Sequence, residues 1–308
     1  MIFSLEKIRL ELKVSWKISR NESLFKENFV LKSGKYQSEI APNIRYGETP
    51  ERIEAEFQEL CSMPTSFDLG WCHSFKNAVS NLRLKTKAHG DVFGYLNLTK
   101  LDHVQTSFSI PIMEQGEIKD YLAQNSQYDI YKLKVSGPSA FSLLAEVCKH
   151  TDKLIRVDAN EGFTSLEQYL EFETKIMNFN IQFIEQPFSS SMTYEYEKLL
   201  PISKFEIIAD ESMEDDFDGE LFSKMFHGIN VKLMKAGGIE NAKRLLDKAR
   251  AHGLKTMVGC MIESSLGISE AYHLAGLCDY CDLDGALLIK KDPFSKLISY
   301  ENGSVILN

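Results

Sequence analysis

Five charged residues recur at nearly regular intervals through the middle of this chain, each at or near the end of a short apolar run: Lys134, Asp158, Glu185, Asp210 and Lys232. The intervals between them are 24, 27, 25 and 22 residues. That spacing fits one strand, one helix and two loops, which is the repeating unit of a (β/α) barrel. Because parallel strands bury their apolar bodies and end at a common rim, the pattern predicts that these side chains meet at that rim.

Eight apolar segments between residues 108 and 288 alternate with amphipathic stretches of helical spacing. This alternation favours a parallel sheet, and eight strands favour a closed barrel over an open doubly wound sheet. No G-x-G-x-x-G segment follows the early strands, which argues against dinucleotide binding. We therefore expect an α/β barrel domain over residues 101–290.

The N-terminal third of the chain follows a different pattern. Residues 1–46 contain short strand-like pieces that alternate apolar and polar side chains, and residues 50–62 and 75–86 have helical spacing. This combination predicts a separate α+β domain over residues 1–100. Residues 291–308 have the pattern of a hairpin, which we expect to return to that first domain.

The overall composition narrows the class of partner. The chain has 308 residues and a formal net charge of −9, and the absence of a basic stripe argues against a nucleic-acid partner. No apolar run approaches the roughly 18 residues of a membrane span, and the N-terminus alternates like a strand rather than a signal peptide. Six scattered cysteines do not suggest a disulfide framework. We expect a cytoplasmic protein that acts on a small molecule. The oligomeric state stays open, a homo-oligomer included.

Three of the recurring residues are acids that follow consecutive strands: Asp158, Glu185 and Asp210. Carboxylate oxygens are hard ligands that suit Mg²⁺, which keeps its other positions for water or substrate. The alternative is that each acid pairs with a lysine or arginine at the rim. Their occurrence on adjacent strands favours a magnesium site.

Lysines flank these acids on two strands. Lys132 and Lys134 form K-x-K on the second barrel strand, so both side chains point into the barrel. A second cation and partial burial lower the pKa of a lysine, as a general base requires. Lys232 on the sixth strand lies opposite, so the two strands could serve opposite faces of one carbon. Ion pairs with the neighbouring acids are the alternative. Lys235 lies beyond the strand body and ranks second as a base.

The eighth strand carries a D-x-D sequence, Asp282 and Asp284, whose side chains face the same way. Two inward acids without a metal role could hold a cationic group such as an α-ammonium. Surface exposure or helix capping are the alternatives. Glu263, which ends the seventh strand, fits a supporting role better than direct catalysis.

Several motifs together resemble the enolase superfamily, in its muconate-lactonizing-enzyme subgroup, and the resemblance covers essentially the whole chain. In order and spacing these motifs are KLK at 132–134, RVDANEGF at 156–163, IEQPF at 184–188, ADES at 209–212, VKLMKAGGI at 231–239 and CMIESSLGIS at 260–269. The resemblance implies a modified (β/α)₇β barrel of the TIM type under an α+β capping domain. Within the subgroup, the D-x-D sequence is similar to that of dipeptide epimerases.

The resemblance also implies roles for individual residues. Asp158, Glu185 and Asp210 would hold Mg²⁺, and Lys134 and Lys232 would be the acid–base pair. Asp282 and Asp284 would bind the substrate α-ammonium. The implied reaction inverts the α-carbon of the C-terminal residue of a dipeptide by 1,1-proton transfer through a metal-stabilised enediolate, with Lys132 assisting the metal.

The capping loop, approximately residues 18–28, departs from the pattern of Ala-Glu epimerases. Those enzymes carry an arginine in this loop for the glutamate side chain. Here Arg20 is nearby, but Asn21 occupies the matching position. Both residues are candidate substrate contacts, and the preferred dipeptide stays open.

Three alternatives remain. An o-succinylbenzoate synthase or an N-acylamino-acid racemase would use the same lysines and acids, but neither substrate carries a free ammonium for Asp282 and Asp284. The third alternative is a catalytically silent barrel that acts as a binding protein. The intact set of lysines and acids argues against it.

Overall fold

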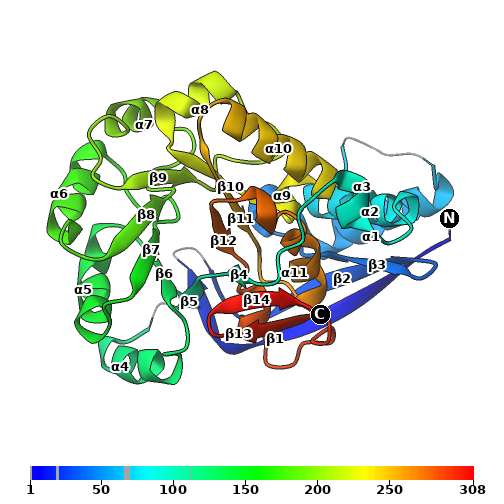
Figure 1. Cartoon of the computed structure of the whole chain (residues 1–308), viewed down its shortest axis with the longest axis horizontal. Helices are drawn as coiled ribbons and strands as arrows, with labels where there is room; N and C mark the ends of the chain where they lie inside the picture. The colour runs from blue at the N-terminus through cyan, green and yellow to red at the C-terminus, as the bar shows by residue number, and fades with distance from the viewer. Residues whose placement is uncertain (1, 19–20, 66–69, 112) are drawn as a thin grey trace.

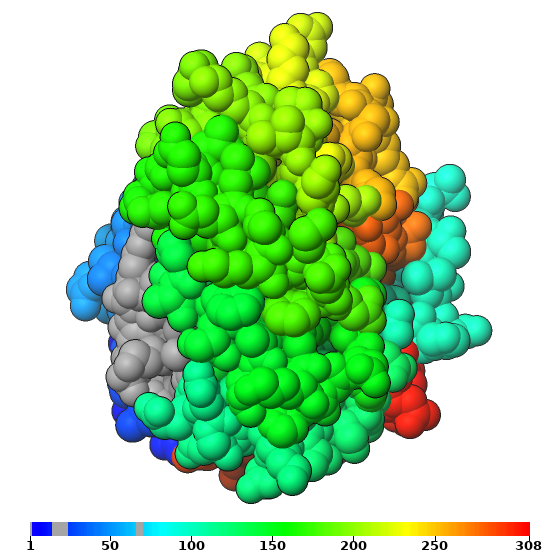
Figure 2. Space-filling view, turned by 90° about the vertical axis from the view of Figure 1, so that its left-hand side faces the viewer, coloured from blue at the N-terminus to red at the C-terminus, as the bar shows by residue number. Residues whose placement is uncertain are grey.

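The computed structural model describes residues 2–18, 21–65, 70–111 and 113–308, with the side chains of residues 14–23 outside the description. Two bodies are visible, a barrel ringed by helices and a smaller cap beside it (Figure 1). Figure 2 shows that the outer helices of the barrel, drawn in green, cover most of one face of the molecule.

The cap is built on a three-stranded antiparallel sheet in the order β1–β2–β3, comprising Phe3–Ile18, Asn21–Ser33 and Tyr36–Ile40. Three helices follow this sheet in the chain: α1 Pro50–Ser62, α2 His73–Lys87 and α3 Val92–Leu96. The helices α1 and α2 pack on one face of the sheet, where Phe29 and Leu31 meet Phe75 and Leu82 in a buried core. Asn28, which alternates with these residues on β2, faces the barrel instead and donates to Ile262 O at 3.0 Å.

The barrel sheet has eight parallel strands paired in chain order: β5 Phe108–Ile110, β6 Ile130–Lys134, β7 Leu154–Asp158, β8 Ile181–Glu185, β9 Glu206–Ala209, β10 Gly228–Lys232, β11 Lys255–Gly259 and β12 Tyr280–Asp282. Helices connect successive strands: α4 Gln115–Gln124, α5 Phe141–His150, α6 Leu166–Ile176, α7 Thr193–Leu199, α8 Gly219–Met225, α9 Leu233–Ala236 with α10 Ile239–Ala251, and α11 Ser265–Tyr272. In the described chain β12 is followed by a 3₁₀ turn, Gly285–Leu288, instead of an α-helix. The predicted (β/α)₇β barrel with an α+β cap is confirmed.

Side chains close the barrel where the backbone ladder ends, between β5 and β12. Ser107 Oγ donates to Asp282 Oδ1 at 2.6 Å, and the backbone N–H of Ser109 donates to Asp284 Oδ2 at 2.7 Å. Leu283 N donates to Thr106 Oγ1 at 2.7 Å. The D-x-D sequence therefore takes part in closing the barrel as well as facing its mouth.

The C-terminal hairpin, β13 Ile298–Glu301 and β14 Ser304–Leu307, forms as the sequence predicts. Its strand β14 pairs with β4, Val104–Gln105, in a separate three-stranded sheet rather than with the sheet of β1 to β3. The division of the chain at residues 100 and 290 stays a prediction. None of the helices in the described part of the chain combines the length and apolar character that a membrane crossing requires.

One buried carboxylate joins the cap to the barrel. Glu39 of β3 is fully buried, and it accepts hydrogen bonds from Asn28 Nδ2 at 2.8 Å and from the backbone N–H groups of Ser264 and Gly267 at 3.0 Å. Ser264 is the N-cap of α11, so Glu39 satisfies the free N–H groups of a barrel helix from the cap.

We expect Glu39→Ala to lower the free energy of unfolding by about 2–4 kcal/mol, because several buried donors would lose their acceptor at about 1–3 kcal/mol each. Urea denaturation followed by circular dichroism measures the change. The control is Glu6→Ala, which removes only an exposed ion pair to Lys32 and should cost at most about 1 kcal/mol. Equal losses in the two variants would contradict a docking role for Glu39.

Candidate active site

All five residues of the repeating series lie at the C-terminal rim of the barrel. Lys134, Asp158, Glu185 and Lys232 are the last residues of β6, β7, β8 and β10, and Asp210 directly follows β9. Strand register places Lys134 level with Asp158, and Asp158 level with Glu185. The rim therefore presents three adjacent acids with a lysine-bearing strand on each side.

The three acids are close enough to share one cation. One ligand atom from each of Asp158, Glu185 and Asp210 lies within 4.8 Å of the others, and all three side chains are buried. Glu185 Oε1 accepts from Asn230 Nδ2 at 2.8 Å, whereas Glu185 Oε2 accepts no hydrogen bond of normal geometry, although Lys132 Nζ lies 2.7 Å away. A buried carboxylate oxygen left in this state, within an all-oxygen donor set, fits a hard divalent cation.

The pKa values of these acids diverge. Burial raises the pKa of Glu185 to about 7, an effect that Lys132 only partly opposes. Burial also acts to raise the pKa of Asp158, but Lys134 and Lys132 overcome it and hold that pKa at about 2. The pKa of Asp210 stays well below its usual value because Lys232 and Lys235 outweigh burial. The negative charge of these buried acids is therefore balanced by neighbouring lysines.

Lys132 lies at the centre of this charge cluster. Its Nζ is 2.7 Å from Glu185 Oε2, 2.7 Å from Asp282 Oδ2 and 3.3 Å from Asp158 Oδ2. Burial acts to lower its pKa, but these carboxylates raise it well above the usual value. For Lys132 these acids outweigh burial, so its pKa does not move towards neutrality.

The candidate bases lie one on each side of the acids. Lys134 Nζ is 2.7 Å from Asp158 Oδ2, and Lys232 Nζ is 2.7 Å from Asp210 Oδ2. Burial acts to lower the pKa of Lys232, but Asp210 raises it above its usual value. Both lysines therefore form the ion pairs that the sequence left as an alternative, with the same acids that could hold a cation.

The two acids of the D-x-D sequence have different surroundings, although both are buried. Asp282 is neutralised by Lys132 and accepts from Ser107 Oγ. Asp284 accepts from the backbone of Ser109, and within the described residues no cation lies at ion-pairing distance from it. Burial, and then the charge of Asp282, raise the pKa of Asp284 to about 6. Asp284 is therefore the acid of this pair that still lacks a cationic partner.

Cap residues that sequence reasoning did not select lie beside the rim. Tyr46 is close enough to Asp210 that the charge of this acid, after burial, raises the tyrosine pKa. Arg45 Nη2 forms a 2.8 Å ion pair with Glu161 Oε2 in the loop after β7. In sequence, YGE at residues 46–48 resembles the end of the first sheet of the capping domain, and this resemblance could have drawn attention to this part of the cap. The candidate Arg20 lies outside the described residues. The candidate Asn21 is described by its backbone, but its side chain is not.

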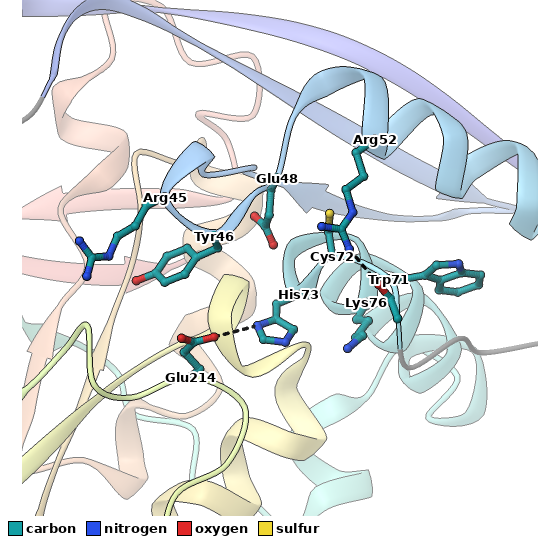
Figure 3. A pocket seen from close by; sticks show the side chains of 10 residues that line it. Arg45, Tyr46, Glu48, Arg52, Trp71, Cys72, His73, Lys76 and Glu214 are labelled. Atoms are coloured by element: carbon teal, nitrogen blue, oxygen red, sulfur yellow. Dashed lines mark hydrogen bonds and ion pairs between the residues drawn. The ribbon is translucent and has the colours of Figure 1, made fainter. Parts of the chain in front are cut away.

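A cavity of about 420 Å³ extends from Tyr46 along the junction of cap and barrel. Figure 3 shows Glu48 and His73 from the cap and Glu214 from the loop after β9 on its walls, and His73 Nδ1 is 3.9 Å from Glu214 Oε2. Side chains from both bodies therefore line this cavity.

Comparisons with known proteins agree with this geometry. A family model described as enolase C-terminal domain-like matches residues 116–308. An L-Ala-D/L-amino acid epimerase from Maribacter sp. is 31% identical, over 99% of this chain and 96% of that protein. One with the same description from Pedosphaera parvula is 42% identical, over 68% of this chain and 61% of that protein. A solved structure of a dipeptide epimerase from Cytophaga hutchinsonii, complexed with Mg and D-Ala-L-Val, is similar to this chain with a TM-score of 0.90 and 24% identity. The match covers 99% of this chain and 92% of that chain, and it shows that the two have the same fold.

The rim of this barrel combines three adjacent acids with lysines on opposite strands. This arrangement is typical of barrel enzymes that catalyse proton transfer beside a bound metal ion. The chain is a member of the enolase superfamily.

Proposed function

We propose that this chain is a Mg²⁺-dependent dipeptide epimerase, which inverts the α-carbon of the C-terminal residue by two-base proton transfer. The single observation that carries the proposal is the placement of Lys134 and Lys232 on opposite sides of one buried acid triad. The names of the relatives from Maribacter and Pedosphaera support the same activity.

Asp158, Glu185 and Asp210 would hold the magnesium ion. Bound there, it supplies Lewis-acid stabilisation of the negative charge that develops on the substrate carboxylate. A cation held by these acids would compete with the lysines for the same oxygens, so Lys134 and Lys232 would be released from their present ion pairs to face the substrate. Lys132, fixed by Glu185 and Asp282, adds a permanent positive charge beside the developing oxyanion.

The two lysines would divide the proton transfer between the two faces of the α-carbon. One neutral lysine takes the α-proton, and the protonated lysine across the barrel delivers a proton to the opposite face. Their strands, β6 and β10, are second and sixth of eight in the barrel order, so the substrate carbon lies between them. The two directions of epimerisation then use the same residues in exchanged roles.

Asp284 and Asp282 would receive the α-ammonium of the dipeptide. Asp282 is already paired with Lys132, so Asp284 supplies most of the uncompensated negative charge. This requirement for a free amine favours a dipeptide over the substrates of an o-succinylbenzoate synthase or an N-acylamino-acid racemase.

The pKa of Asp284 gives this assignment a pH dependence. Its pKa of about 6 means that the carboxylate is lost as pH falls through 6, so kcat/KM for a dipeptide should decrease below that pH. Asp284→Asn should raise KM about 10–100-fold at pH 8, since a charge-assisted hydrogen bond is worth about 1.5–3 kcal/mol, and should remove this acid limb. Asp129→Asn, an exposed acid beside the first residue of β6, is the control. An unchanged KM in Asp284→Asn would exclude the ammonium contact.

The activity itself is tested with a library of L,L-dipeptides incubated with the protein and Mg²⁺ in D₂O. Mass spectrometry should show a one-dalton gain, and chiral chromatography should show the L,D-diastereomer appearing with it. Omission of Mg²⁺ should abolish both signals. Exchange on no dipeptide would overturn the proposal in favour of the synthase.

A further inference from the structure

Lys235 is a buried lysine whose ammonium group is bound by Asp210. It lies on α9, the short helix directly after β10, and only 2% of its surface is exposed. Its Nζ donates to the backbone carbonyl of Asp210 at 2.5 Å and to Asp210 Oδ1 at 2.6 Å. A lysine enclosed in this way cannot reach a substrate carbon, so it does not serve as the alternative base that its place in the sequence suggested.

The two hydrogen bonds fix the orientation of one metal-ligand candidate. Because the same ammonium holds both the main chain and the side chain of Asp210, the carboxylate cannot rotate away from the rim without breaking a buried ion pair. Lys235 occupies Oδ1, whereas Oδ2 is the oxygen that Lys232 contacts at 2.7 Å. The two oxygens of Asp210 therefore have different partners. Oδ1 is bound by the buried Lys235, and Oδ2 is bound by Lys232 at the rim.

The helix that carries Lys235 is itself held by the cap. The sulfur of Met234, next to Lys235, accepts from the backbone N–H of Ala41 at 3.4 Å and from Asn77 Nδ2 at 3.5 Å. Gly238, with φ of 128°, lies so close to α2 that a Cβ there would be 2.7 Å from Ser80 Oγ. The position of α9, and with it the position of Lys235, depends on docking of the cap.

We propose that Lys235 is a positioning residue that aims Asp210 at the metal site and links this site, through α9, to the docked cap. The inference rests on the proposed function in taking Asp210 as a metal ligand. Partners that orient a metal ligand commonly contribute 10–100-fold to metal affinity. The same range is expected here.

The test is isothermal titration of the metal-free protein with Mg²⁺, without substrate. Lys235→Met should raise the Kd about 10–100-fold. Lys235→Arg should restore at least part of the affinity, because a guanidinium can also donate to a carbonyl and a carboxylate. Lys76→Met is the matched control, since Lys76 is a nine-tenths-buried lysine of α2 that packs beside Gly237 at the end of α9. The Kd of this variant for Mg²⁺ should equal that of the wild type.

Gly238→Ala provides a second test that leaves Lys235 in place. The added Cβ should displace α9 from α2 and weaken Mg²⁺ binding in the same direction, with little further effect when Lys235→Met is already present. If Lys235→Met does not fold, Gly238→Ala decides the question alone. Wild-type affinity in a folded Lys235→Met or Gly238→Ala variant would overturn the inference. A wild-type protein that binds no Mg²⁺ would instead overturn the proposed metal site.

Discussion

Lys134→Ala and Lys232→Ala are each expected to lower kcat for epimerisation by about 10²–10⁴-fold, the range that general acid–base groups contribute. Each lysine is the last residue of its strand and lies beside an acid, Lys134 next to Asp158 and Lys232 next to Asp210. Epimerisation needs a proton donor on one face of the carbon and a base on the other, so loss of either lysine stops turnover in both directions. Chiral chromatography of the dipeptide products measures the effect.

Isotope exchange distinguishes two bases from one. Each single variant should still exchange the α-proton of the diastereomer that presents this proton to the remaining lysine, while failing to convert it. The control is Lys198→Ala, which replaces a lysine of α7 that lies over the ring of Tyr194. This variant should leave both the isotope exchange and the epimerisation unchanged. Near-normal conversion in Lys134→Ala or Lys232→Ala would exclude the two-base assignment, because the other lysines of the described rim, Lys132 and Lys235, are held by buried carboxylates.

The placement of the site could be predicted because it depends on a local property repeated along the chain. Each acid or lysine ends an apolar strand, and parallel strands bring their C-terminal ends to one rim whatever the details of packing. The proximity of Asp158, Glu185 and Asp210 could therefore be predicted without knowing which side chains contact them.

What the sequence could not reveal depends on contacts between distant segments. Lys132 and Asp282 are 150 residues apart and meet only because β5 and β12 close the barrel. That contact raises the pKa of Lys132, and it leaves Asp284 as the acid of the two that has no ion pair among the described residues. The D-x-D pattern alone does not show this difference between the two acids. The sequence predicts a loop at Lys235, beyond the body of the sixth strand, but a short helix follows β10 and directs the side chain back to Asp210.

The cap hairpin shows a related limit. The sequence predicts a capping loop over approximately residues 18–28, yet β2 begins at Asn21 and pairs with β1 as far as Ile18. Polar residues are compatible with a two-stranded ribbon because the partner strand satisfies the backbone groups, whatever the side chains. Strand pairing outweighed side-chain pattern there.

Substitution of Glu185, the central acid of the proposed metal site, is expected to have the second large effect. Wild-type protein should gain about 2.7 kcal/mol of stability when Mg²⁺ is present at 100 times its Kd, because an ion that binds only the folded state shifts the folding equilibrium by that amount. Glu185→Gln should lose essentially all of this gain, since Glu185 is the middle acid of the triad. Thermal unfolding with and without Mg²⁺ measures the difference.

The same variant should be about as stable as the wild type when Mg²⁺ is absent. Burial raises the pKa of Glu185 from its usual value to about 7, so between about pH 4.5 and 7 the folded state binds a proton that the unfolded state does not. Keeping this carboxylate ionised above pH 7 therefore costs stability, and the neutral amide avoids that cost. Glu206→Gln, at the opposite end of the neighbouring strand β9, is the control and should keep the full response to Mg²⁺. If Mg²⁺ stabilised Glu185→Gln as much as the wild type, the ion would bind elsewhere, and the buried acids would serve only to neutralise the lysines between them.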